Sequence, residues 1–170
     1  MSSPIDLGNI LSELGPRFAA VAEESDAGDR FVSENYRVLR QSRVFSALVP
    51  GEFGGSGIRH ADMCEFLRVL AGHCPATALA LSMHQHLVAA AVANHRAGRP
   101  GQALLEKVGS GELILVSTGA NDWLESNGCA ERTDGGYRVT ATKPFASGAP
   151  AGDIIITSAV HEGPEGGEVL

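Results

Sequence analysis

Apolar residues recur every three or four positions through most of the first 110 residues. Between residues 4 and 24, for example, Leu7, Leu11 and Leu14 would share one face of a helix. Gly15-Pro16 inside this pattern indicates a kink, or a division into two helices. Similar spacing predicts further helices over residues 31–45, 60–73, 75–97 and 101–108.

The pattern changes near residue 110, where short runs of β-branched and apolar residues replace the helical spacing. Strands are predicted over residues 113–117, 129–133, 137–142 and 153–160, and Asp134-Gly135-Gly136 is a hairpin turn signal. The polar, Gly-rich residues 161–170 complete no further β layer. We therefore expect a helical domain over residues 1–110 and an incomplete β domain over 111–170, in a truncated chain.

The most apolar stretch, residues 76–93, carries His84, Gln85 and His86 at its middle. Three polar side chains there would be unfavourable in a lipid bilayer, so we expect a buried core helix and no membrane span. The N-terminus lacks the basic and apolar regions of a signal peptide. Together with the cysteines, which are read below as reduced thiols, these features predict a cytoplasmic protein.

The amino-acid composition argues against several classes of function. A net charge of −7 argues against nucleic-acid binding, because tracking phosphates needs clustered Lys and Arg. The three cysteines form no CxxC pair, so they fit neither a zinc site nor a disulfide framework and are read as reduced thiols. No metal site is expected.

Several motifs admit two interpretations. The glycine-rich loop at residues 51–57 could cradle a phosphate, but a helix-to-helix connector is favoured because it lacks the P-loop Gly-Lys-Ser/Thr. Arg37, Arg40 and Arg43 are three residues apart, so they would form one helical ridge that either grips a phosphate or faces solvent. The hydroxyls of Ser117 and Thr118, followed by Gly119, suit either the edge of a flat polar ligand or a polar turn.

His84 and His86 cannot face one point, because helix positions two apart lie about 200° from each other. At most one of them can line a pocket. A buried core histidine with satisfied hydrogen bonds is the favoured interpretation, and a metal site is disfavoured by the spacing.

In their order along the chain, four segments together resemble the acyl-CoA dehydrogenase superfamily. Residues 48–71 resemble its VPEEYGG loop and next helix, and residues 74–88 resemble its long central helix. Residues 111–122 and 134–159 resemble its VTEPxxGSD and TKxWIT segments. The resemblance implies an α+β fold: an N-terminal all-α domain, then part of an antiparallel β-barrel-like domain, with the family's C-terminal four-helix bundle absent from this chain.

The same resemblance implies a flavin cofactor, FAD, with FMN as the alternative. By analogy with the family, Phe145 would pack beside the flavin ring and the Ser147 hydroxyl would reach it near N5. Ser117, with Val116 beside it, would hold the pyrimidine edge of the ring.

Departures from the family pattern point to a second chemistry. Residues 118–123 lack the Glu-Pro and Gly-Ser-Asp that help hold the CoA thioester. The pattern of Lys143, Phe145 and Ser147-Gly148 is similar to the flavin-dependent monooxygenase branch, in which reduced flavin reacts with oxygen. His84 or His86 could then line the pocket.

Three functions are therefore expected as alternatives. The first is an FAD-dependent acyl-CoA dehydrogenase-like oxidoreductase, which moves a hydride from an acyl thioester to flavin N5. The second is a reduced-flavin monooxygenase, and the third a non-catalytic remnant or interaction module. For the first two, the resemblance implies an acyl-CoA or other small substrate, an electron-transfer partner or flavin reductase, and a homo-oligomer in full-length form. The dehydrogenase's catalytic glutamate lies in the missing bundle, so this chain alone is expected to be inactive.

Overall fold

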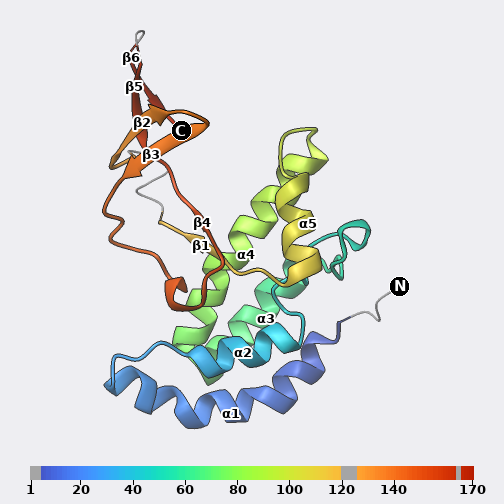
Figure 1. The fold of residues 1–170 in the computed structure, drawn as a ribbon. Coiled ribbons are helices and arrows are strands. Elements are labelled where there is room, and N and C mark those ends of the chain that lie inside the picture. The colour runs from blue at the N-terminus through green and yellow to red at the C-terminus, as the bar shows by residue number, and fades with distance from the viewer. Residues whose placement is uncertain (1–4, 120–125, 164–165) are drawn as a thin grey trace.

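The computed structural model describes residues 5–119, 126–163 and 166–170, and it places a helical layer before a set of short strands (Figure 1). The helices are α1 (Leu7–Ala27), α2 (Ser33–Gln41), α3 (His60–His73), α4 (Pro75–Arg96) and α5 (Gln102–Gly111). The strands are β1 (Leu115–Ser117), β2 (Cys129–Thr133), β3 (Gly136–Thr140), β4 (Ile154–Ile156), β5 (Val160–Gly163) and β6 (Gly166–Val169). The α+β class is confirmed. Short 3₁₀ turns occupy Gly51–Phe53 and Ala149–Ala151.

Helix α4 is the centre of the helical layer and contacts α3, α5, α1 and β1. By length and composition it could cross a membrane, yet 56% of its most apolar window is buried inside the fold. Its buried face includes Leu81 and Val88, which join the main hydrophobic core. This packing agrees with the predicted core helix.

Helix α1 is continuous through Gly15 and Pro16, so the predicted division does not occur. It begins with Asp6, whose side chain accepts a hydrogen bond from the Asn9 backbone N–H at 3.0 Å. Gly15 packs directly against α3, because an added Cβ would come within 2.6 Å of the His73 ring. The predicted first residue of this helix, Pro4, lies outside the described residues.

Helix α2 ends at Gln41, four residues before the predicted end at residue 45. Arg43 adopts a left-handed backbone with φ 58°, and the Val44 N–H bonds back to the Leu39 carbonyl. This is a Schellman termination with arginine at the position that glycine usually fills. The predicted ridge of Arg37, Arg40 and Arg43 is therefore wrong, and the three have separate partners: Glu34, Asp153 and Glu112.

The glycine-rich loop at residues 51–57 is a connector between α2 and α3. The backbone N–H groups of Gly54, Gly55 and Gly57 all bond to carbonyls within residues 49–51. Because these donors are already used, the loop offers little to a phosphate. The connector interpretation is the one that the structure supports.

The strands form two sheets that the predicted strand 153–160 links. The first half of residues 153–160 forms β4, which pairs in parallel with β1. The last residue, Val160, begins β5 and pairs in parallel with Cys129 of β2. The four-stranded sheet has the order β3-β2-β5-β6 and stands away from the helices (Figure 1). Its hairpins β2–β3 and β5–β6 are antiparallel. The first was predicted from residues 134–136, whereas β6 was not predicted. The parallel pairs were not expected, and the strands described do not close into a barrel.

Candidate functional site

Strand β1 is held between α4 and β4, and its carboxyl end carries the first group of predicted site residues. The Leu115 N–H donates to Nδ1 of His84 at 2.9 Å, and Nε2 of His84 donates to the Phe45 carbonyl at 2.9 Å. Both ring nitrogens are therefore used, and burial lowers the pKa of His84 to about 4. His84 is a neutral core residue, whereas His86 is exposed on the same helix.

Val116 and Ser117 are both buried at the end of β1. The Val116 side chain packs against the turn at Gly152, where an added Cβ would come within 2.2 Å of it. The Ser117 hydroxyl accepts a hydrogen bond from the Gly119 N–H at 3.3 Å. These contacts show a polar strand end, with Ser117 fixing the turn that follows.

Gly119 brings the first group of site residues next to the second. Its φ of 91° is a left-handed conformation that favours glycine, and an added Cβ would lie 3.5 Å from Cβ of Phe145. Phe145 is 71% exposed, which is unusual for a phenylalanine. An uncovered aromatic ring therefore lies beside the end of β1.

Lys143 has a structural role at the base of this segment. Its ammonium group donates to the carbonyls of Asn127 and Ser158, at 2.8 and 2.7 Å. These bonds tie the chain before β2 to the chain between β4 and β5. Asp153 anchors the other end of the segment. Its carboxylate accepts a hydrogen bond from the Ile114 N–H at 2.7 Å and forms an ion pair with Arg40.

Ser147 lies on the helical side of the segment and lines a pocket of about 400 Å³. Helix α4 supplies Ala76, Leu79 and Ala80 to the apolar wall of this pocket. Asp26, Asp29 and Arg30 make up a polar rim at the turn between α1 and α2. The pocket therefore offers a small molecule an apolar wall on one side and polar groups on the other.

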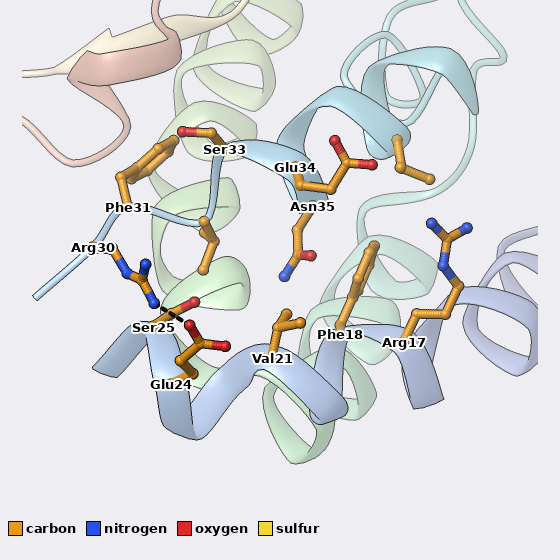
Figure 2. Close-up of a pocket in the computed structure, with 12 residues that line it drawn as sticks. Arg17, Phe18, Val21, Glu24, Ser25, Arg30, Phe31, Ser33, Glu34 and Asn35 are labelled. Atoms are coloured by element: carbon orange, nitrogen blue, oxygen red, sulfur yellow. Dashed lines mark hydrogen bonds and ion pairs between the residues drawn. The ribbon is translucent and has the colours of Figure 1, made fainter. Parts of the chain in front are cut away.

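A second pocket, of about 380 Å³, lies between the second half of α1 and the start of α2 (Figure 2). Figure 2 shows Phe18 and Val21 inside it, and Arg30 paired with Glu24 at one side. Asn35 is buried there and donates to the Thr77 hydroxyl at 2.9 Å. None of the predicted site residues lines this pocket.

Sequence reasoning missed two residues at the site. Tyr36 was not among the candidate site residues, yet its hydroxyl lies beside Gly148. Leu79 carried no signal beyond its place in an apolar helix, yet it is 61% exposed in the pocket that Ser147 lines. A tyrosine in a core position, where phenylalanine would suffice for packing, is the one sequence signal that could have drawn attention.

Residues 13–112 match the family described as the acyl-CoA dehydrogenase N-terminal domain. The dibenzothiophene monooxygenase of Rhodococcus erythropolis is 26% identical over 176 residues, which cover 92% of this chain and 39% of that protein. The probable FMNH2-dependent monooxygenase SfnC of Pseudomonas putida is 28% identical over 161 residues, which cover 95% of this chain and 40% of that protein.

Among solved structures, KijD3 in complex with FMN and a dTDP sugar matches with a TM-score of 0.82 and 26% identity. The match covers 96% of this chain and 43% of KijD3, so the chain spans about two fifths of the length of these relatives. The relatives support the monooxygenase alternative more than the acyl-thioester dehydrogenase. Through its match to the N-terminal domain, the chain belongs to the acyl-CoA dehydrogenase family.

Proposed function

We propose that the full-length protein is a reduced-flavin-dependent monooxygenase that acts on a small, mainly apolar substrate. The observation that carries this proposal is the arrangement at residues 145–148. Within three residues, an uncovered aromatic ring is followed by a hydroxyl that lines a pocket with an apolar wall. The relatives named as monooxygenases support the same chemistry.

The residues present fit a flavin. The exposed Phe145 ring offers an apolar face to a flat heteroaromatic group, and the Ser147 hydroxyl can donate or accept at its edge. Ser117 is buried, so its hydroxyl would reach the pyrimidine edge of the flavin only through an opening at the turn formed by Gly119. Val116 would contribute through its backbone. When bound and reduced, flavin supplies the electrons that activate oxygen. We favour FMN over FAD because KijD3 was solved with FMN and SfnC is named FMNH2-dependent.

The pocket beside Ser147 would receive the substrate. Its apolar wall on α4 would bind a hydrophobic body and exclude water, while Asp26, Asp29 and Arg30 at the rim would face solvent. A separate flavin reductase would supply the reduced cofactor. We further propose that the protein works in the cytoplasm as a homo-oligomer.

The experiment uses the full-length protein, FMN, FAD and a flavin reductase with NADH. We expect tighter binding of FMN than of FAD, and transfer of isotopically labelled oxygen from O₂ into an apolar sulfur or aromatic test substrate. Anaerobic bleaching of bound flavin by an acyl-CoA, without oxygen transfer, would instead establish the dehydrogenase. Failure to retain any flavin would support the non-catalytic alternative.

A further inference from the structure

The hydroxyl of Tyr36 is buried without a hydrogen-bond partner among the residues that the structure describes. The side chain is only 1% exposed and lies between the rings of Phe31 and Phe45, at centroid distances of 4.9 and 5.3 Å. Phenylalanine would fill the same space without burying an unpaired polar atom. The hydroxyl therefore calls for an explanation beyond packing.

The hydroxyl lies beside residues 145–148, the segment proposed to contact flavin. An added Cβ at Gly148 would lie 3.4 Å from the Tyr36 Oη. Gly148 has φ 85° and begins the 3₁₀ turn that follows Ser147. Helix α2 contacts this turn, so Tyr36 lies at one place where the helical layer meets the bend that presents Ser147.

We propose that Tyr36 is a positioning residue whose hydroxyl forms a hydrogen bond with the bend at residues 146–148 when flavin binds, and so fixes the orientation of Ser147. This inference rests on the proposed flavin function. Burial raises the pKa of Tyr36, so the hydroxyl remains a protonated donor at any working pH. The ring is held by two aromatic neighbours, which suits a fixed anchor for a bend.

The test compares Tyr36→Phe with Tyr137→Phe in the full-length protein. Each variant removes one hydroxyl, and Tyr137 lies on β3 of the distant sheet, so it is a matched control. For Tyr36→Phe without flavin, we expect a thermal midpoint equal to or above that of the wild type, because an unpaired buried hydroxyl is removed. The FMN dissociation constant, measured by quenching of flavin fluorescence, should rise about tenfold. Tyr137→Phe should change neither value.

Each other outcome overturns the proposal in a distinct way. A lower midpoint for flavin-free Tyr36→Phe would show that the hydroxyl already has a partner in the ligand-free fold. An unchanged dissociation constant would show that flavin binding makes no use of it, while leaving the flavin function intact. If the wild type binds neither FMN nor FAD, the flavin function and the role of Tyr36 both fail.

Discussion

His84 joins the central helix to the first strand, because its Nδ1 accepts a hydrogen bond from the Leu115 N–H at 2.9 Å. Its Nε2 donates to the Phe45 carbonyl at the same distance, so one ring spans three segments of the core. Leu115 is two residues before Ser117. The position of the candidate site on the helical layer therefore depends on this imidazole.

Replacing His84 by leucine should destabilise the protein by about 2–4 kcal/mol, because the Leu115 N–H and the Phe45 carbonyl would both be buried and unpaired. Urea unfolding followed by circular dichroism measures the change. His86→Leu is the control, since His86 is exposed and surface substitutions usually change stability by less than about 0.5 kcal/mol. Equal effects of the two substitutions would contradict the role assigned to His84.

Acid should weaken the fold through the same residue. The pKa of His84 falls from 6.5 to about 4 in the folded protein because burial disfavours the charged ring. Below about pH 6.5, His84 binds a proton in the unfolded chain but not in the folded chain. The contribution of neutral His84 to the free energy of unfolding is therefore fully present above that pH and falls toward pH 4. The loss attributable to His84 is up to roughly 3 kcal/mol.

Urea unfolding midpoints between pH 7 and pH 4 test this dependence. His84→Gln keeps a polar side chain and removes the titrating group, so its midpoint should decline less steeply across the interval. Arg40 and Asp153 are charged groups near His84 with opposite effects on its pKa. A wild-type slope that His84→Gln leaves unchanged would assign the pH dependence to other groups.

Arg43 and Glu112 form an ion pair at 3.5 Å, and both have left-handed backbones, with φ 58° and 51°. Arg43→Gly would relieve its backbone but leave the buried carboxylate without its cation, so we expect a net loss of roughly 1–3 kcal/mol at pH 7. Burial already raises the pKa of Glu112 above 4.5, and losing the arginine should raise it further. The loss should therefore be smaller at pH 5 than at pH 7, because without the arginine the carboxyl takes up a proton more readily. Unfolding at the two pH values checks this, and an equal loss at both would contradict it.

Local signals predicted the elements that local physics determines. The predicted bounds of α3 and β2 are those observed, and the hairpin at residues 134–136 follows from its glycines. Elements that depend on distant partners were missed. Arg43 ends α2 without a glycine signal, because its guanidinium is held by the carbonyls of Gly54 and Gly109.

The same reason explains the misread β region. Residues 153–160 form two strands because β4 pairs with β1 while Val160 pairs with Cys129 in the other sheet. The polar residues 161–170 contribute β6 because backbone pairing with β5 requires no apolar side chains. At the site, family resemblance singled out Phe145 and Ser147, but only the fold shows the pocket that Ser147 lines and the Tyr36 hydroxyl beside Gly148.

Phe145→Ala separates flavin binding from stability. The ring is 71% exposed, so its removal should change the free energy of unfolding by less than about 0.5 kcal/mol. If the ring packs on flavin, the FMN dissociation constant should rise about tenfold, as for the loss of one aromatic contact. Val139→Ala, at another exposed apolar position on β3, is the control and should leave FMN binding unchanged. Unchanged FMN binding in Phe145→Ala would exclude this ring from the cofactor site.

Leu79→Trp tests whether the pocket beside Ser147 selects the substrate. The larger side chain would occupy part of the roughly 400 Å³ pocket, so KM should rise several-fold for a bulky apolar substrate and little for a small one. FMN affinity should stay within twofold of the wild type, because Leu79 lies on α4 and is not among the residues proposed to hold flavin. Val21→Trp fills the separate pocket shown in Figure 2 and is the matched control, with no expected change in KM. The substrate would bind outside this pocket if Leu79→Trp raised KM equally for the bulky and the small substrate. The same conclusion would follow if Val21→Trp also raised KM more for the bulky substrate than for the small one.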